Sequence, residues 1–236
     1  MSEALRLLES AARICTACRL AQTRTQVVFG VGDPDADVLL VGEAPGFNED
    51  LQGEPFVGAA GQLLNRLLGE IGLSRDDVYI ANVIKCRPPN NRDPAQDEVD
   101  SCKDYLRAQI TLIDPNVVVT LGNFATKLLL RTETGITRMR GRTYSWWQGR
   151  TLVPTYHPAA ALRSGERLIG DMQSDFALVR DALSKPRAST SSTGSPTGQG
   201  DRPEPTSVVK RRDVNGPNAQ DPDAAGDDPE QMNLFA

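Results

Sequence analysis

Short apolar runs alternate with longer amphipathic stretches along the first 185 residues of the chain. The apolar runs, each of a length typical of a buried strand, lie at residues 37–42, 78–85, 117–121 and 151–156. Apolar residues spaced three and four apart predict helices at residues 4–20, 61–71, 95–113 and 123–130. Such alternation is typical of an α/β fold, with a mostly parallel sheet covered by helices on both faces.

Polar or glycine-rich residues stand at the carboxyl end of each predicted strand. Residues 42–46 follow the first strand, Asn82 lies in the second, residues 122–123 follow the third, and His157 follows the fourth. Ligands of parallel sheets bind beyond the carboxyl ends of the strands. We therefore expect one functional site at this edge of the sheet.

The composition of the chain changes near residue 186. Residues 186–230 contain seven of the sixteen prolines and no aromatic residue, so they bury too little apolar surface to offset the entropy lost on ordering. We expect a disordered linker there and one folded domain over residues 1–185. This domain is close to neutral, with 21 Lys and Arg against 23 Asp and Glu, which excludes a generally basic nucleic-acid coat but allows a local basic cleft.

The N-terminal residues and the single histidine narrow the function classes further. No apolar run reaches the roughly 18 residues of a membrane span, and the first 15 residues lack the apolar core of a signal peptide. We expect a cytoplasmic protein, in a reducing compartment where cysteines bind metals more often than they form disulfides. His157 is the one histidine, which excludes a site built from several histidines of one chain.

The chain has four cysteines, which are candidates for a metal centre. Cys15 and Cys18 form a C-x2-C pair, Cys86 follows the second predicted strand, and Cys102 lies in the predicted helix 95–113. Four thiolates ligate either a [4Fe–4S] cluster or a zinc ion, and free buried cysteines are the alternative. A shared metal centre would tie the N-terminal helix to the middle of the domain.

The glycine-rich segment after the first strand is a candidate ligand site. Residues 42–46 (GEAPG) place backbone N–H groups where a ligand could meet them, although an ordinary strand-to-helix turn uses similar residues. Residues 53–61 add further glycines and Phe56, which follows a proline and lies outside any helical stripe. We expect Phe56 to stack on a planar ligand, with a simple core position as the alternative.

Three segments together carry a specific resemblance. Residues 42–64 (GEAPGFNEDLQGEPFVGAAGQLL), 82–94 (NVIKCRPPNNRDP) and 157–162 (HPAAAL) resemble the family 4 uracil-DNA glycosylases, the iron–sulfur branch of their superfamily. The resemblance covers residues 1–185 in order. It implies a three-layer α/β/α fold around a four-stranded parallel sheet. It also implies a [4Fe–4S] cluster, held by Cys15, Cys18, Cys86 and Cys102.

The reaction implied by this resemblance is hydrolysis of the N-glycosidic bond of deoxyuridine in DNA, the first step of base excision repair. A base inside a duplex is out of reach, so it must be flipped into a pocket. Phe56 would stack on the uracil, and Asn82 would pair with its O4 and N3–H, which the amino group of cytosine would spoil. His157 would donate to O2 as negative charge builds on the departing base.

The first motif departs from that of better-known uracil glycosylases at Ala44. Those enzymes carry a water-positioning Asp there, and an alanine can neither position nor activate water. Catalysis must then depend on leaving-group stabilisation and on other carboxylates, for which Glu43 and Glu49 are the candidates and Glu49 is favoured. We expect the backbone of Ala44 and Pro45, together with Glu43, to line the uracil site.

Basic residues suggest where DNA is held. Arg87 and Arg92, with Lys85, surround Cys86, and a second basic group at residues 138–150 lies beside Trp146-Trp147; both are candidates for phosphate contacts, with a solvated charged face as the alternative. We expect residues 159–163 to form a loop. Leu162 or Arg163 of this loop would fill the space that the flipped base leaves.

The last residues of the chain form a small apolar cluster after the predicted linker. Residues 231–235 (QMNLF) resemble the bacterial sliding-clamp-binding pentapeptide, of the form Gln-Leu-x-Leu-Phe; the matching residues are Gln231, Met232, Leu234 and Phe235. A flexible tether to the clamp would raise the concentration of the enzyme at DNA, and a chance terminal cluster is the alternative. We expect a monomer associated with the nucleoid.

Two other functions remain open at this stage. A covalent uracil-DNA trapping protein of the same superfamily would use a histidine in a basic loop, but residues 87–92 contain none. A non-catalytic iron–sulfur DNA-binding protein stays possible because Ala44 replaces the water-positioning Asp. Activity on other deaminated bases is a third alternative, although the pairing expected of Asn82 favours uracil.

Overall fold

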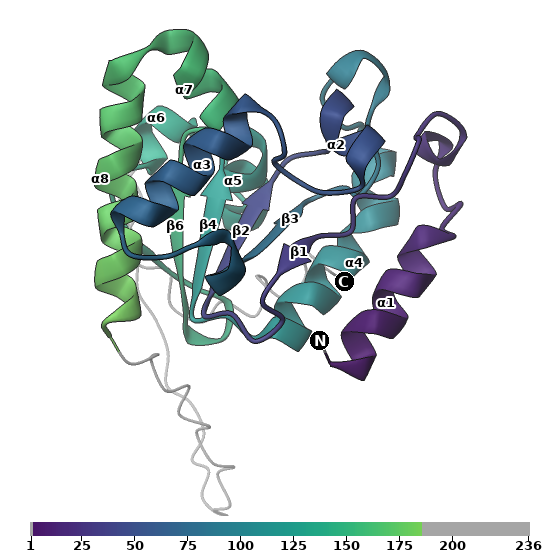
Figure 1. Cartoon of the computed structure of the whole chain (residues 1–236), viewed down its shortest axis with the longest axis horizontal. Helices are drawn as coiled ribbons and strands as arrows, with labels where there is room; N and C mark the ends of the chain where they lie inside the picture. Colours follow the sequence, from purple (N-terminus) through teal and green to yellow (C-terminus); the bar gives the residue numbers. More distant parts are fainter. Residues whose placement is uncertain (1, 186–236) are drawn as a thin grey trace, which may run out of the picture.

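A computed structural model describes residues 2–185 and shows one sheet between two layers of helices (Figure 1). The strand order is β1-β3-β2-β4-β6-β5, and the four central strands are parallel. The predicted α/β/α fold around four parallel strands is confirmed, and the short antiparallel edge strands β1 and β5 are additions to it. The strands are β1 Val31–Gly32, β2 Val38–Gly42, β3 Tyr79–Asn82, β4 Val117–Leu121, β5 Tyr144–Trp146 and β6 Arg150–Thr155.

The central strands are buried along nearly their whole length, because helices cover both faces of the sheet. Every residue of β2, β3 and β4 is buried, and β6 has one half-buried position. Leu40 in β2 lies opposite Ile80 on one side and Val119 on the other. This two-sided burial explains why the strands read as continuous apolar runs in the sequence.

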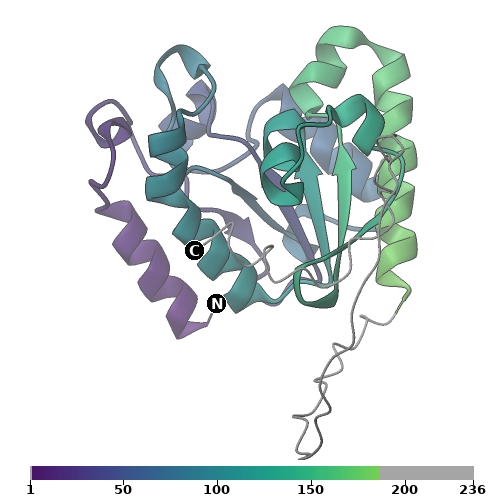
Figure 2. The same ribbon diagram turned by 180° about the vertical axis from the view of Figure 1, so that it is seen from behind.

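One helical layer consists of α1, α4, α5 and the short α6, which face the viewer in Figure 2. Their bounds are α1 Glu3–Arg13, α4 Gln96–Ile113, α5 Asn123–Leu130 and α6 Ile136–Met139. α1 ends earlier than its predicted bound at residue 20. Cys15 and Cys18 therefore lie in the connection that follows the helix and precedes the 3-10 turn η1 (Arg19–Gln22).

The other layer consists of α3 (Ala59–Glu70), α7 (Pro158–Ser164) and α8 (Glu166–Leu183), which share a second apolar core with the opposite face of the sheet. The prediction of a loop at residues 159–163 is wrong, since these residues belong to α7. Pro158 occupies the first helical turn and His157 caps it, an arrangement that favours helix initiation. The 18-residue α8 was not predicted.

Short elements complete the carboxyl edge of the sheet and its connections. The six-residue helix α2 (Phe47–Gln52) connects the end of β2 with the segment that leads to α3. Its N-cap, Gly46, belongs to the glycine-rich segment. The remaining 3-10 turns are η2 Arg75–Asp77, η3 Pro89–Asn91 and η4 Trp147–Gly149.

The basic residues proposed as phosphate contacts do not all reach the surface. Lys85 and Arg150 are each 1% exposed, so they cannot meet a phosphate in this fold. Lys85 donates to the backbone carbonyl of Asn82 at 2.8 Å and to Gln109 at 2.5 Å. Arg150 pairs with Asp114 at 2.6 Å and lies over the ring of Trp147. Both are structural in this fold.

Two of the sequence predictions lie outside the described part of the chain. These are the linker at residues 186–230 and the clamp-binding motif at residues 231–236. Among the helices that are described, none combines the length and the apolar character needed to cross a membrane.

Candidate active site

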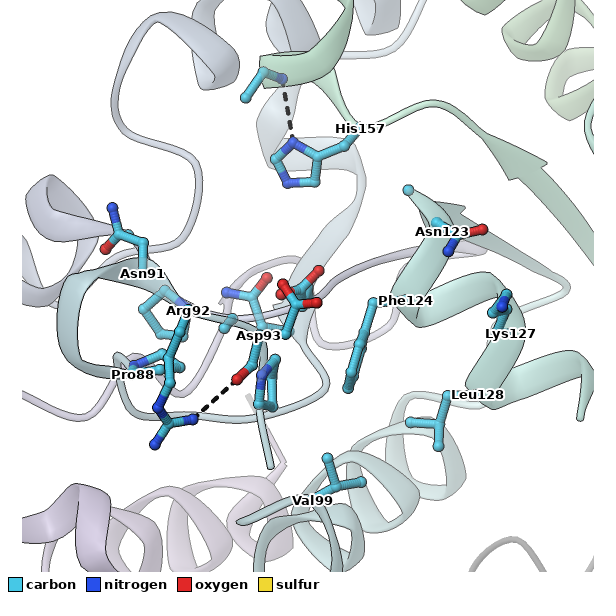
Figure 3. Close-up of a pocket in the computed structure, with 18 of the residues that line it drawn as sticks. Pro88, Asn91, Arg92, Asp93, Val99, Asn123, Phe124, Lys127, Leu128 and His157 are labelled. Atoms are coloured by element: carbon cyan, nitrogen blue, oxygen red, sulfur yellow. Dashed lines mark hydrogen bonds between the residues drawn. The ribbon is translucent and has the colours of Figure 1, made fainter. Parts of the chain in front are cut away.

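A cavity of about 880 Å³ opens at the carboxyl edge of the central strands, where the sequence predicted a site (Figure 3). Residues from the ends of β2 and β3 and from the segments after β4 and β6 contribute to its wall. The cavity brings together nine of the predicted site residues, namely Glu43, Ala44, Pro45, Glu49, Phe56, Asn82, Arg92, His157 and Arg163. Arg87 and Leu162, proposed as DNA contacts, do not line it.

Asn82 and Phe56 meet against the end of β2. A Cβ atom on Gly42 would lie 2.3 Å from Asn82 Oδ1 and 2.8 Å from Phe56 Cζ, so only glycine leaves room for both side chains. Asn82 is 2% exposed, and its Oδ1 atom is buried without a hydrogen-bond partner among the described residues. An unsatisfied buried acceptor is costly unless a ligand donor completes it. Asn82 therefore offers an acceptor to a bound N–H group.

Phe56 is held in an uncommon backbone conformation. Its φ angle of 55° lies in the left-handed region, which a bulky side chain rarely adopts and which often marks a functional site. Arg75 holds this conformation by donating to the carbonyl of Phe56 at 3.2 Å and to that of Pro55. Phe56 is 6% exposed, belongs to the core and also lines the cavity.

The ring of His157 points into the cavity, on the side that faces Asp93 and Phe124 (Figure 3). Its centroid lies 5.6 Å from that of Phe56, with 29° between the ring planes. Gly122, with a φ of 100°, lets His157 lie close to its backbone, because a Cβ on residue 122 would lie 3.0 Å from His157 Cβ. His157 therefore lies close to the backbone of Gly122, directly after β4.

The protonation state of His157 follows from its surroundings. Burial and, to a smaller extent, the charge of Arg163 lower the pKa of His157 to about 4, so the imidazole is neutral at physiological pH. Its Nδ1 atom accepts a hydrogen bond from the backbone N–H of Ala159 at 3.2 Å. The single proton of the neutral ring is therefore on Nε2, which becomes the donor available to a ligand.

Four carboxylates line the cavity, namely Glu43, Glu49, Asp93 and Glu133, and sequence reasoning identified the first two. Glu49 on α2 accepts a hydrogen bond from the backbone N–H of Val57 at 3.2 Å, which fixes one of its oxygens. Burial and the charge of Asp93 raise the pKa of Glu43. Asp93 was not among the predicted site residues, because an Asp before a proline in a loop carries no distinctive signal.

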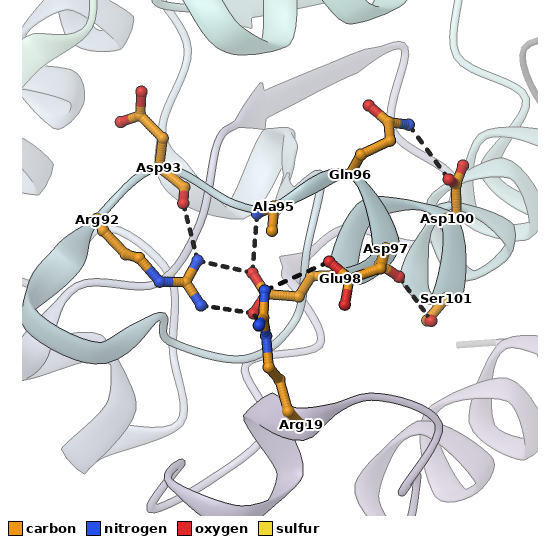
Figure 4. Close-up of polar contacts among 9 residues, drawn as sticks. All are labelled: Arg19, Arg92, Asp93, Ala95, Gln96, Asp97, Glu98, Asp100 and Ser101. Atoms are coloured by element: carbon orange, nitrogen blue, oxygen red, sulfur yellow. Dashed lines mark hydrogen bonds and ion pairs between the residues drawn. The ribbon is translucent and has the colours of Figure 1, made fainter.

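Arg92 lines the cavity, but its guanidinium turns to the buried Glu98 (Figure 4). Two nitrogens of Arg92 donate to the two carboxylate oxygens of Glu98 at 2.6 and 2.8 Å, and one also donates to the carbonyl of Asp93 at 2.9 Å. Arg19, next to Cys18, donates to Glu98 at 2.8 Å from the other side. The geometry thus gives Arg92 a positioning role for the cavity wall.

Glu98 itself was not identified from the sequence, where it is one acidic residue among several at a helix start. Its side chain is fully buried, and its hydrogen bonds, that from Arg92 first, lower the pKa of Glu98 to about 2. Its backbone partner is the N–H of Ala95, at 2.9 Å, just before α4. One buried carboxylate therefore joins the segment that carries Cys18, the start of α4 and the cavity wall.

The four cysteines come together from distant parts of the sequence. The thiol of Cys86 interacts electrostatically with Cys15 and Cys18, and that of Cys102 with Cys18 and Cys86. Burial raises the pKa of Cys102 to about 11 and raises that of Cys86 as well. Buried thiols of this kind lose their protons when a metal binds them.

Hydrogen-bond donors already point at two of these sulfur atoms. Arg24 Nη1 lies 3.3 Å from Cys86 Sγ, and the backbone N–H of Lys85 lies 3.3 Å from Cys102 Sγ. Donors of this kind stabilise thiolate ligands and tune a bound cluster. The surroundings of the cysteines are therefore suited to ligating thiolates.

Within residues 2–185, no group of three or more His, Cys, Asp or Glu side chains forms a closed site for one metal ion. Four thiolates are a ligand set that both a [4Fe–4S] cluster and a zinc ion take. The four cysteines are therefore candidate ligands for a metal centre.

Comparison with known proteins agrees with this geometry. The model of the uracil DNA glycosylase superfamily matches residues 29–183. The chain belongs to this superfamily. It is 47% identical over 184 residues to the type-4 uracil-DNA glycosylase of Sulfurisphaera tokodaii, covering 75% of this chain and 83% of that protein. The predicted resemblance to family 4 is confirmed.

Two further type-4 uracil-DNA glycosylases show the same extent of similarity. The protein of Archaeoglobus fulgidus is 47% identical over 178 residues, covering 72% of this chain and 89% of the relative. The protein of Thermotoga maritima is 45% identical over 163 residues, covering 69% of this chain and 85% of the relative. The similarity therefore extends over most of each relative as well as over the folded domain.

Proposed function

We propose that this protein is a uracil-DNA glycosylase, which hydrolyses the N-glycosidic bond of a flipped-out deoxyuridine and leaves an abasic site in DNA. The observation that carries the proposal is the cavity itself. An unpaired buried amide oxygen, an aromatic ring and a neutral imidazole donor meet at one edge of the sheet, in a chain similar over its folded part to type-4 uracil-DNA glycosylases.

Asn82 supplies base discrimination in this proposal. Its unpaired Oδ1 accepts the N3–H of uracil, and its amide N–H donates to O4. Cytosine has no N3–H and carries an amino group where uracil has O4, so both contacts would be lost. A site built around such hydrogen bonds rejects an analogue strongly, because its own buried polar group is then left unpaired.

His157 stabilises the departing base. When the bond between C1′ and N1 breaks, its electron pair stays with uracil, and the negative charge is shared with O2. The Nε2–H of the neutral imidazole donates to this oxygen. A fixed donor aimed at developing charge contributes roughly 3–4 kcal/mol. Phe56 stacks on the base and holds it in this orientation.

Water completes the hydrolysis. Its oxygen bonds to C1′, its proton passes to a carboxylate or to solvent, and uracil takes up a proton after it leaves. Ala44 cannot orient this water, so we assign the task to Glu49, whose second oxygen lies beside Gly46 of the cavity wall. Glu43, which also lines the cavity, would favour the cationic sugar in its ionised form.

We also propose that Cys15, Cys18, Cys86 and Cys102 hold a [4Fe–4S] cluster. The electrostatic interactions among the thiols and the N–H donors to two of them support it, together with the resemblance of the chain to the type-4 uracil-DNA glycosylases. None of the four cysteines lines the cavity, so the cluster would be structural, joining the segment after α1 to α4. Iron and sulfide analysis with visible absorbance would distinguish it from zinc.

One assay tests the catalytic proposal against its rivals. The protein is incubated with an oligonucleotide that carries a single uracil, and abasic sites are then cleaved with alkali. Strand scission supports glycosylase activity, a stable protein–DNA adduct would indicate covalent trapping, and binding without either product would indicate a non-catalytic protein. Replacing Asn82 and His157 together by alanine should remove most of the scission, and full scission by that variant would contradict the assigned roles.

The partner of the last residues is a separate proposal. We propose that Gln231, Met232, Leu234 and Phe235 bind a bacterial sliding clamp, on the sequence pattern alone, and that a monomeric enzyme is held near the nucleoid in this way. Deletion of residues 231–236 should abolish clamp binding in a pull-down with purified clamp and leave uracil release from a short oligonucleotide intact. Unchanged clamp affinity after the deletion would refute this partner.

A further inference from the structure

An exposed aromatic side chain stands at the mouth of the cavity. Phe47 is the first residue of α2 and directly follows Gly46, which lines the cavity. It is 55% exposed, although a phenylalanine of this size gains about 1.5–3 kcal/mol from full burial. This ring is part neither of the core nor of the reaction described above, so it is accessible to a ligand at the surface.

A cation holds one face of this ring. The guanidinium carbon of Arg87 lies 5.1 Å from the centroid of the Phe47 ring, the geometry of a cation–π contact. Arg87 Nε also donates to Asn91 Oδ1 at 2.7 Å, and Asn91 lines the cavity. The pair Phe47–Arg87 is therefore linked to the cavity rim, and Phe47 remains more than half exposed.

The charge of Arg87 is available to a polyanion. Among residues 2–185, no carboxylate forms an ion pair with Arg87, in contrast to Arg92, which is bound to Glu98. A ring presented beside an unneutralised guanidinium matches the two chemical parts of a nucleotide, namely a flat base and a phosphate.

Because the proposed substrate is a polymer, the nucleotides next to the deoxyuridine must pass over this rim of the cavity. Successive nucleotides of a strand are spaced by only about 3.4 Å along a duplex, so a deoxyuridine in the cavity places its neighbours directly at the mouth. Helices α2 and α7 both lie at this edge of the sheet (Figure 1), and α7 carries the exposed Leu162. Extrusion also removes the stacking partner of each neighbouring base.

We propose that Phe47 is a stacking platform for the nucleobase that flanks the deoxyuridine in the same strand, with Arg87 holding the ring and meeting a backbone phosphate. This inference rests on the proposed glycosylase function and adds a second base-binding position to it. Stacking on an aromatic side chain tolerates any base, so the platform contributes affinity without a sequence preference.

The test compares variants of the full chain in binding to single-stranded DNA, with tetrahydrofuran replacing the deoxyuridine sugar so that no base is cleaved. Fluorescence anisotropy should show about tenfold weaker binding for Phe47→Ala, the lower part of the range found for base–aromatic stacking. Phe47→Trp keeps a planar ring and should bind like the parent chain. Leu7→Ala, which removes another exposed apolar side chain from the distant helix α1, is the control and should have no effect.

A change in the DNA identifies the partner of the ring. Removing the base 5′ or 3′ of the tetrahydrofuran should, for one of the two positions, weaken binding of the parent chain and erase its difference from Phe47→Ala. Equal binding by the parent and Phe47→Ala on intact DNA would overturn the proposal. A deficit of Phe47→Ala that persists whichever neighbouring base is removed would also overturn it.

Activity separates this inference from the proposed function. In single-uracil DNA, Phe47→Ala should raise KM more than it lowers kcat, since the ring contacts a neighbour of the reacting nucleotide. If the parent chain released no uracil, the glycosylase function would fail. If it released uracil and Phe47→Ala matched it in both KM and binding, the stacking platform alone would fail.

Discussion

The two side chains proposed to bind uracil lie in the cavity wall, Asn82 buried and His157 half-buried. Among the described residues, His157 Nδ1 accepts from a backbone N–H, which leaves Nε2–H for a ligand, and Asn82 Oδ1 has no partner. Both side chains lie so close to Gly122 and Gly42 that a Cβ at either glycine would crowd them. In the proposed function, base recognition and leaving-group stabilisation therefore depend on a few atoms at neighbouring strand ends.

The pH dependence of His157 follows from its burial. Its folded-state pKa of about 4 lies below the ordinary value of 6.5, so the imidazole stays neutral as pH falls from 8 to 5. The unfolded chain binds the proton first, and this group therefore lowers stability as pH falls through 6.5. NMR titration should give a midpoint below 5, and the rate of uracil release should show no His157-dependent change near pH 6.5; an inflection there that vanished in His157→Gln would contradict this.

Gly42 is a sharp test of the packing between Asn82 and Phe56. In Gly42→Ala the new Cβ would lie 2.3 Å from Asn82 Oδ1, so the amide must move away from its uracil-binding position. We expect the single-turnover rate of uracil release to fall about 100-fold, the effect of misplacing a binding group by about 1 Å.

The matched control for this substitution is Gly69→Ala in α3, where an added Cβ meets nothing within 4 Å. It should leave the rate unchanged and stabilise the helix by about 0.5–1 kcal/mol. Equal rates for Gly42→Ala and the parent chain would show that Asn82 does not need this position.

At the scale of elements, the cavity wall depends on helix α4 through Glu98. This carboxylate joins Arg92, Arg19 and the start of α4 in one buried cluster. Removing one partner of a buried, hydrogen-bonded charge costs more than the pair contributes, since the remaining charges are left unpaired. Glu98 therefore connects the segment after α1 with the cavity wall.

Glu98→Gln should destabilise the protein by about 3 kcal/mol, the size reported for broken buried ion pairs. The folded-state pKa of Glu98 is lowered to about 2 from 4.5, so its contribution is complete above pH 4.5 and is lost as pH falls toward 2. Thermal melts should therefore show a large difference in Tm at pH 7 that shrinks below pH 4.

Asp97→Asn is the control for this cluster. Asp97 is exposed and pairs with Arg19 at the longer distance of 3.4 Å. Its effect should stay within about 0.5 kcal/mol at every pH, as for other surface pairs. Similar destabilisation by the two variants would show that Glu98 does not connect these segments.

At the scale of the whole molecule, the proposed cluster would connect segments that secondary structure does not. Cys15 and Cys18 lie in an irregular connection, whereas Cys86 and Cys102 lie beside the sheet and in α4. With the proposed cluster in place, Cys86→Ser should lose iron and visible absorbance, lower Tm, and make the chain susceptible to proteolysis near residues 14–24. Ser101→Ala, next to Cys102 but exposed at its hydroxyl, should change none of these; full iron content in Cys86→Ser would refute the ligand set.

Much of the fold follows from local patterns in the sequence. The four parallel strands could be predicted because burial on both faces requires continuous apolar runs, and α4 and α5 because their apolar residues recur at helical spacing. The edge strands β1 and β5 could not, since they have two and three residues. The sequence predicts a loop at residues 159–163, but capping by His157 and Pro158 begins a helix there.

The sequence by itself determined the α/β fold, the edge of the sheet that carries the site, and the family, because strand burial and the motifs after strands are local in sequence. Only the tertiary structure decided which charges act at that site. Lys85 and Arg150 proved buried, Arg92 turned to Glu98, Asp93 joined the cavity wall, and Phe47, next to Gly46 of that wall, proved exposed. Pairing, burial and exposure depend on residues far apart in the chain, which no local pattern records.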